Sequence, residues 1–135
     1  MSASRRCILH AGCLLATAQA VLAQPAAQAE GARAIRAAET DLREAVRRVD
    51  EGSLPGSLAI SRLRQALNEV ERAMLRLPAE ARQGAPWQAA VREVSGALAL
   101  LRDEGTTLGA VREAAGNALA TLPALRGEET GSEGG

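Results

Sequence analysis

Residues 57–77 have the sequence SLAISRLRQALNEVERAMLRL and lie between Pro55 and Pro78. Large apolar residues recur in this stretch at alternating steps of three and four, which places them on one stripe of an α-helix. The stripe contains Ile60, Leu63, Leu67, Val70, Met74 and Leu77. Ser57 is the expected N-cap, and Pro78 predicts a helix end at Leu77 because the residue before proline disfavours helix. The stretch therefore predicts an amphipathic helix over 57–77.

Three further segments show the same apolar periodicity and predict helices near 26–51, 86–104 and 107–122. They are rich in Ala, Leu, Arg and Glu, which favour helix, and the chain has no Tyr or Phe to favour strands. Their stripes contain Ile35, Ala38, Leu42, Ala45 and Val49, then Trp87, Val91, Val94, Leu98 and Leu101, and finally Leu108, Val111, Ala115, Ala118 and Leu122.

The sequence gives a clear end for the first predicted helix but leaves its start open. Gly52 follows the last apolar position and predicts a glycine C-cap. At the start, Asp41 and Glu44 have the spacing of a capping box. This spacing leaves two readings of the alanine-rich residues 25–39, which either begin the same helix or form a separate turn before it.

The third predicted helix carries Pro86 at its first position, where proline is favoured. Gly105 then permits a left-handed stop. Thr106 or Thr107 is the expected N-cap of the fourth helix, whose apolar stripe slips by one residue relative to the third. The slip favours a turn over one long helix.

Four apolar stripes with short connections predict an all-α protein, a small antiparallel bundle of four helices. Two alternatives remain open from the sequence: three helices with a long last one, and a helical hairpin that dimerises. Many stripe positions are alanine, so we expect a thin core. Its stability should depend on a few large residues, chiefly Leu63, Leu67, Val70, Leu98 and Leu101.

The first 23 residues have the layout of a secretory signal peptide. Arg5 and Arg6 form a charged start, an apolar run extends over 7–23, and small residues precede the cut. We expect cleavage between Ala23 and Gln24, which uses the whole run, rather than after Ala20. The run is short for a membrane span, so we expect no stable span after cleavage. The predicted location is periplasmic or secreted.

The remainder, residues 24–135, carries a formal charge of −2, because the predicted signal holds Arg5 and Arg6 but no acidic residue. Acidic and basic residues are interleaved, which disfavours nucleic acid as a partner. We expect one helical domain over 24–125. Residues 126–135, RGEETGSEGG, contain no apolar side chain and predict a disordered acidic tail.

Both cysteines and the only histidine, Cys7, Cys13 and His10, lie in the predicted signal. From Gln24 onward there is no Cys, His, Lys, Tyr or Phe. Haem attachment, histidine-held metals and disulfides are therefore not expected in the exported chain. Serine and threonine hydroxyls have no histidine or lysine to activate them. The sequence predicts no catalytic residue, cofactor or metal site.

One row of donors on the second predicted helix is a candidate interaction face. It consists of Arg64, Asn68, Arg72 and Arg76, spaced four residues apart. Such an arginine strip is able to hold carboxylates or phosphates, although Glu69 and Glu71 nearby also fit an ordinary solvated face. Trp87, the only aromatic residue, is either an anchor for a partner or a packing residue at the end of the bundle.

These observations favour a non-enzymatic exported helical protein that binds an unknown protein partner or forms a homo-oligomer through an alanine-rich helical face. The alternative is a small anion-binding or enzymatic domain that uses the surface arginines. Residues 24–135 retain arginine and carboxylate side chains on helical surfaces. These groups suit binding better than catalysis.

Overall fold

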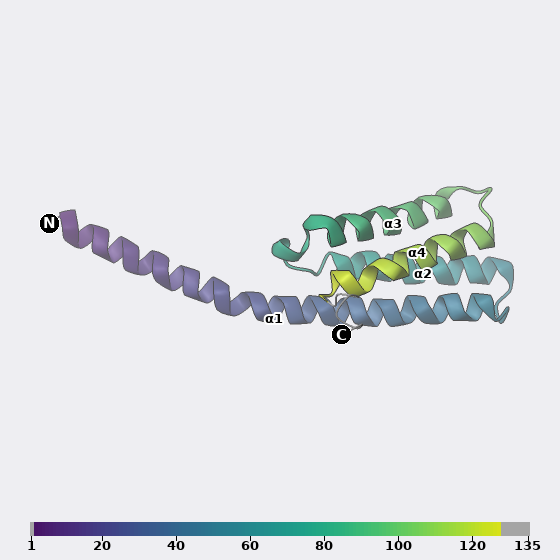
Figure 1. Cartoon of the computed structure of the whole chain (residues 1–135), viewed down its shortest axis with the longest axis horizontal. Helices are drawn as coiled ribbons and strands as arrows, with labels where there is room; N and C mark the ends of the chain where they lie inside the picture. Colours follow the sequence, from purple (N-terminus) through teal and green to yellow (C-terminus); the bar gives the residue numbers. More distant parts are fainter. Residues whose placement is uncertain (1, 128–135) are drawn as a thin grey trace, which may run out of the picture.

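Four α-helices run alternately up and down beside one another (Figure 1). The computed structural model describes the backbone of residues 2–127 and the side chains of residues 26–127. Its elements are α1 (Ser2–Asp50), α2 (Gly56–Met74), a 3-10 helix η1 (Ala79–Ala81), α3 (Gly84–Arg102) and α4 (Leu108–Leu125). The predicted all-α, antiparallel four-helix bundle is confirmed. The three-helix alternative is wrong because residues 103–107 interrupt the helix.

α1 is continuous from Ser2 to Asp50, and its N-terminal part extends past the other helices (Figure 1). A separate turn over residues 25–39 is therefore wrong. Ile35 and Leu42 are both fully buried on the face that packs into the bundle, so one packed helix face spans the expected break. The predicted signal, residues 1–23, lies outside the part whose side chains are described, and residues 128–135 of the predicted tail lie outside the described residues altogether.

The end of α1 has the predicted glycine cap. Gly52 has a φ of +68°, a left-handed conformation that side chains with a Cβ rarely adopt. Its N–H donates to the Val49 carbonyl, and the Ser53 N–H donates to the Arg48 carbonyl. This pair of hydrogen bonds is a Schellman motif, which satisfies carbonyls that the last helical turn leaves open.

Three other predicted boundaries differ from the structure. α2 begins at Gly56 with Pro55 as its N-cap residue, so Ser57 does not cap it. α3 begins two residues before Pro86, which lies in the first turn, where a missing N–H costs no helical hydrogen bond. Gly105 has no positive φ; instead, the Asp103 side chain accepts a hydrogen bond from the Gly105 N–H. A side-chain turn therefore ends α3.

Both ends of α4 are explained by local contacts. Thr107 is the N-cap, as predicted, and its Oγ1 accepts a hydrogen bond of 3.1 Å from the Ala110 N–H. At the other end the helix continues through Pro123 to Leu125, three residues beyond the expected end. Leu125 is 7% exposed, and its burial favours the extra turn despite the hydrogen bond that proline removes.

The predicted stripes form the core. Of the 23 buried apolar residues between 26 and 127, nine are alanine, which leaves the packing to a few large side chains. The largest of those that are fully buried are Ile35, Leu42, Leu63, Leu67, Val70, Val111 and Leu122. α1 packs mainly on α2 and α3 mainly on α4. The thin, alanine-rich core therefore brings helix backbones close together.

Gly31 lies at a close approach of α1 to the chain that follows α2. A Cβ added at Gly31 would lie 2.8 Å from Leu77 Cδ2 and 3.3 Å from Leu77 Cα. Gly31 and Leu77 are both buried. α2 ends at Met74, three residues before the expected end at Leu77, and the turn that follows it brings Leu77 against α1. Only a glycine leaves room for that contact.

Candidate functional site

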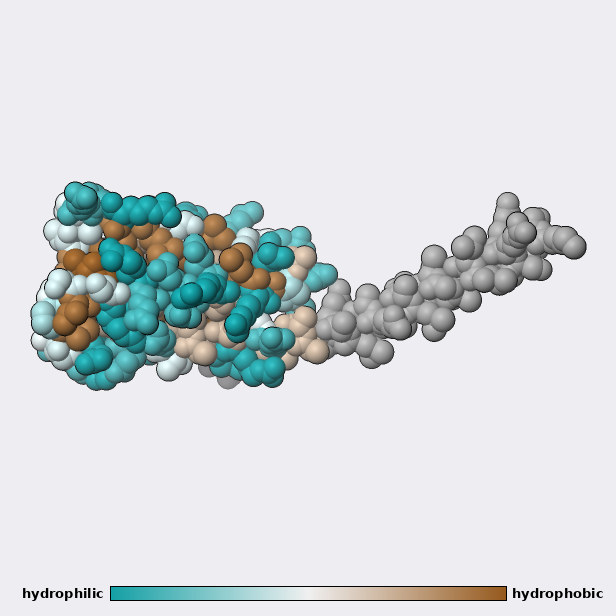
Figure 2. Space-filling model, turned by 180° about the vertical axis from the view of Figure 1, so that it is seen from behind, coloured by the Kyte–Doolittle hydropathy of each residue, from teal (hydrophilic) through white to brown (hydrophobic). Residues whose placement is uncertain are grey.

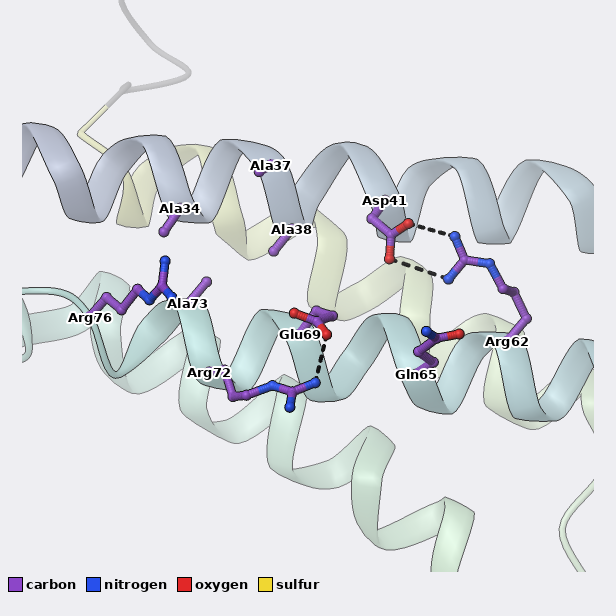
Figure 3. A pocket seen from close by; sticks show the side chains of 10 residues that line it. All are labelled: Ala34, Ala37, Ala38, Asp41, Arg62, Gln65, Glu69, Arg72, Ala73 and Arg76. Carbon is purple, nitrogen blue, oxygen red and sulfur yellow. Dashed lines mark hydrogen bonds and ion pairs between the residues drawn. The ribbon is translucent and has the colours of Figure 1, made fainter.

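A groove of about 620 Å³ lies open between α1 and α2 (Figure 3). We call it the α1–α2 groove; its lining consists of Ala34, Ala37, Ala38, Asp41, Arg62, Gln65, Glu69, Arg72, Ala73 and Arg76. α1 contributes mostly alanines, whereas α2 contributes mostly long polar side chains. The short side chains of α1 leave the space, and the arginines and carboxylates of α2 form its rim.

Ion pairs occupy most of the charges in the α1–α2 groove. Arg62 binds Asp41 at two points, with Nη1–Oδ2 at 3.2 Å and Nη2–Oδ1 at 2.5 Å. The hydrogen-bonded Asp41 carboxylate raises the pKa of Arg62. Arg72 binds Glu69 on the same helix. Among residues 26–127, the side chain of Arg76 makes no hydrogen bond or ion pair, so its guanidinium is available to a ligand.

The arginine strip does not form one site. Arg72 and Arg76 line the α1–α2 groove, whereas Arg64 and Asn68 line a second, smaller groove between α2 and α3. Arg64 there donates to the Leu101 carbonyl at 3.3 Å, near the end of α3. Each four-residue step on a helix turns about 40° beyond a full turn, so the row rotates by roughly 80° from Arg64 to Arg72, and Arg76 lies beyond the end of α2. That rotation divides the strip between two grooves.

Trp87 is partly buried and packs against the hydrophobic core at the start of α3. It does not line the α1–α2 groove or the groove between α2 and α3. The structure therefore places Trp87 apart from the arginines with which the sequence grouped it.

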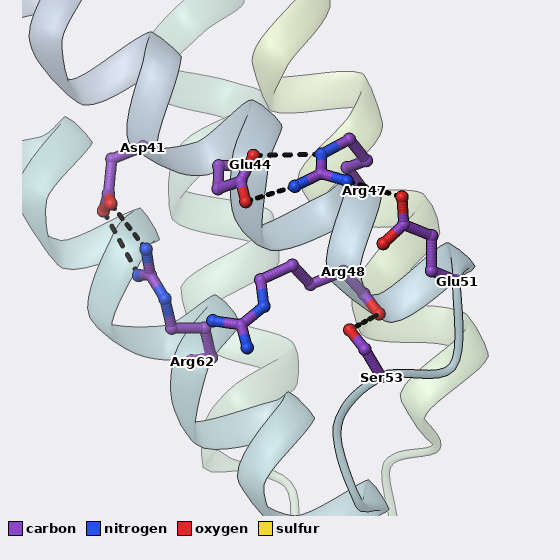
Figure 4. A network of polar contacts seen from close by, with 7 residues as sticks. All are labelled: Asp41, Glu44, Arg47, Arg48, Glu51, Ser53 and Arg62. Atoms are coloured by element: carbon purple, nitrogen blue, oxygen red, sulfur yellow. Dashed lines mark hydrogen bonds and ion pairs between the residues drawn. The ribbon is translucent and has the colours of Figure 1, made fainter.

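A largely exposed side of α1, next to the α1–α2 groove, carries a charged row at steps of three and four residues. This outer row consists of Glu30, Arg33, Ala37, Thr40, Glu44 and Arg47. At one end, Arg47 binds Glu44 and Glu51 (Figure 4), and the hydrogen bond from Arg47 lowers the pKa of Glu44. At the other end, Glu30 and Arg33 make no ion pair within residues 26–127.

Two ion pairs connect α1 to α4, and sequence reasoning missed both. Glu39 is 2% exposed and accepts hydrogen bonds from Arg126 Nε at 2.9 Å and Arg43 Nη2 at 3.2 Å. Asp50 binds Arg112 at two points, 2.7 and 2.8 Å, and this contact lowers the pKa of Asp50. A sequence signal existed for Glu39, which lies four residues after Ile35 on the edge of the apolar stripe.

The rear face of the bundle is mostly hydrophilic, with apolar surface mainly toward the end that holds the α1–α2 connection (Figure 2). Leu58 and Leu75 are the exposed large apolar residues within 26–127. In the described part of the chain, no helix has the length and hydropathy to cross a bilayer, and no cluster of three carboxylate, histidine or cysteine side chains is placed to hold a metal.

No protein-family model, curated protein or solved structure matches this chain. The candidate site is therefore defined by its own geometry. That geometry is an alanine-lined groove with one unpaired arginine, beside an exposed charged row on α1.

Proposed function

We propose that this protein is an exported, non-enzymatic helical bundle that acts by binding a protein through the exposed side of α1 and the adjoining α1–α2 groove. The observation that carries the proposal is the run of short side chains at Ala34, Ala37 and Ala38 beside a charged rim. Alanines let a second helix approach closely, and the paired charges of the rim give such a contact its orientation.

The chemistry of residues 24–135 supports binding rather than catalysis. No histidine, lysine, cysteine or tyrosine is present there to move a proton near neutral pH. The anion-binding alternative has less support, because the arginine strip is split between two grooves and Arg72 already binds Glu69. Export rests on the signal-like residues 1–23 and predicts a mature chain that begins at Gln24.

The experiment is cross-linking in cells that make the protein with Ala37→Arg, compared with Ala99→Arg. Both alanines are exposed helix positions, on α1 and α3 respectively, so each arginine is tolerated by the fold. We expect Ala37→Arg to remove the protein cross-links and Ala99→Arg to retain them. Equal cross-linking by both variants would show that this side of α1 is not the binding surface. The mass of the exported chain tests the cleavage between Ala23 and Gln24.

A further inference from the structure

We propose that the outer row of α1 pairs with the same row of a second copy of this chain, antiparallel and about a twofold axis. This inference rests on the proposed function and names the occupant of that surface. Five of its six residues are exposed and Glu44 is half-buried. The row belongs to a helix whose opposite side is fixed in the core, and it carries both signs of charge in a fixed order.

When two copies of the outer row lie antiparallel, each charged residue of one copy faces a residue of opposite charge on the other. Read from the N-terminus, the outer row is Glu30, Arg33, Ala37, Thr40, Glu44 and Arg47. In an antiparallel pair centred between residues 38 and 39, Glu30 of one copy lies opposite Arg47 of the other, and Arg33 lies opposite Glu44. Ala37 then lies opposite Thr40. A twofold axis repeats every contact, so each copy supplies both partners of each pair.

A parallel arrangement of the same row lacks this complementarity. Equal residue numbers would then meet, and each of Glu30, Arg33, Glu44 and Arg47 would face its own like charge. Like charges directly opposite each other disfavour association. The row therefore specifies the antiparallel orientation.

The middle of the row permits close contact. Ala37 and Thr40 are its two smallest side chains, and Ala34 and Ala38 adjoin them in the α1–α2 groove. Short side chains allow two helix backbones to approach, with the charged residues closing both ends. Glu30 and Arg33 have no ion-pair partner within residues 26–127, so they have no contact to give up. Glu44 and Arg47 bind each other, and Arg47 also binds Glu51, so a second copy would add its charges to an existing exposed ion pair.

Two charge-reversal variants, measured alone and mixed, test this pairing. The mixture shows whether a loss of association comes from the charges or from misfolding of one variant. In a homodimer of Arg33→Glu, residue 33 of each copy faces Glu44 of the other with the same charge. In a homodimer of Glu44→Arg, residue 44 faces Arg33 with the same charge. A mixed dimer of the two variants restores opposite charges at both contacts. Arg92→Glu on α3, where Arg92 is exposed, is the matched control for the change in net charge.

The measurement is sedimentation velocity of residues 24–135 across a concentration series at low salt, where surface charges act most strongly. We expect each of Arg33→Glu and Glu44→Arg to raise the dimer dissociation constant about tenfold or more, because each contact occurs twice. The equimolar mixture should return to the wild-type value, and Arg92→Glu should match wild type. Recovery on mixing excludes misfolding as the cause.

Two results would overturn the inference: a wild-type chain that stays monomeric up to about 1 mM, the weak end of specific association, or a mixture that associates no better than either variant. Cross-linking with Ala37→Arg separates this failure from failure of the proposed function. If the chain is monomeric but Ala37→Arg still removes cross-links to another protein, the surface binds a different partner and only the twofold pairing is wrong. If neither self-association nor cross-linking responds, both proposals fail.

Discussion

The interior of the bundle and the outer contacts of α1 hold the helices together by different means. Inside, apolar stripes from all four helices meet, and large residues such as Leu67 are fully buried. Along α1, carboxylates reach across to arginines on α2 and α4: Asp41 to Arg62, Glu39 to Arg126 and Asp50 to Arg112. Within residues 26–127, no ion pair joins α3 to α4.

This difference indicates separate roles for the two regions. Burial of apolar area is non-directional, so the stripes stabilise the bundle but leave helix register loosely specified. Ion pairs with two-point geometry are directional, and two of the three, Asp41–Arg62 and Asp50–Arg112, have it and fix how α1 lies against its neighbours. α1 is thus held on its inner side, which leaves most of its outer row exposed to solvent. The following variants probe the two regions separately.

The largest effect is expected in the interior. Leu67→Ala removes a fully buried side chain from a thin core and should lower the free energy of unfolding by about 2 to 5 kcal/mol. Leu75→Ala, at a position 62% exposed, is the control and should change it by less than about 0.5 kcal/mol. Urea unfolding followed by circular dichroism measures both. Equal effects would mean that the α2 stripe does not face the core.

The second-largest loss of stability is expected at the buried ion pair between Glu39 and Arg126. Glu39→Gln keeps the side-chain volume but removes the charge that binds Arg126 and Arg43, and should cost about 2 kcal/mol of unfolding free energy. Glu113→Gln on the exposed side of α4 should be near neutral. The same urea titration applies. A neutral Glu39→Gln would show that apolar packing alone holds α4 to α1.

Gly31→Ala tests the close approach between α1 and Leu77. The added Cβ lies 2.8 Å from Leu77 Cδ2, so we expect a net loss of about 1 kcal/mol, even though alanine favours helix. Gly96→Ala on α3 meets nothing within 4 Å and should instead stabilise the chain by up to about 1 kcal/mol. Thermal melts of the two variants should therefore shift in opposite directions. A rise in both would contradict the close contact.

The smallest effect concerns Asp50 and pH. Its hydrogen-bonded partner Arg112 lowers the folded-state pKa of Asp50 below the usual value of 3.8. A lowered folded pKa means that the pair stabilises the fold above the unfolded pKa and that this contribution is lost as pH falls through the folded pKa. Asp50→Asn should therefore flatten the fall in melting temperature below about pH 4. If the melting temperature of Asp50→Asn falls below pH 4 as steeply as that of the wild type, the Asp50–Arg112 pair adds nothing to stability.

The helices and their inner faces were predictable because periodicity is a local signal. Leu63, Leu67 and Val70 repeat within one segment, and their burial follows from that spacing alone. Gly52 was likewise identified from its place after the last apolar residue, and its positive φ confirms the cap.

The contacts of α1 depend on residues that are far apart in the chain, so no local pattern contains them. Arg126 and Glu39 are 87 positions apart, and which arginine reaches which carboxylate is decided only once the helices have packed. Gly105 was misread for a different, local reason: the Asp103 side chain, two residues earlier, supplies a turn that needs no left-handed residue. The arginine strip is divided between two grooves because the helix rotates between Arg64 and Arg72, and because Arg76 lies beyond the end of α2.

Disulfide formation between chosen cysteines tests most directly whether α1 presents its outer row to a second copy. Residues 24–135 contain no cysteine, so Ala37→Cys and Thr40→Cys each introduce a single thiol. A disulfide needs Cα atoms about 4 to 7 Å apart. We predict that a mixture of the two variants cross-links faster than either alone, and that Ala99→Cys on α3 does not cross-link. Faster linkage of Ala37→Cys to itself, or equal linkage at Ala99→Cys, would contradict the antiparallel pairing.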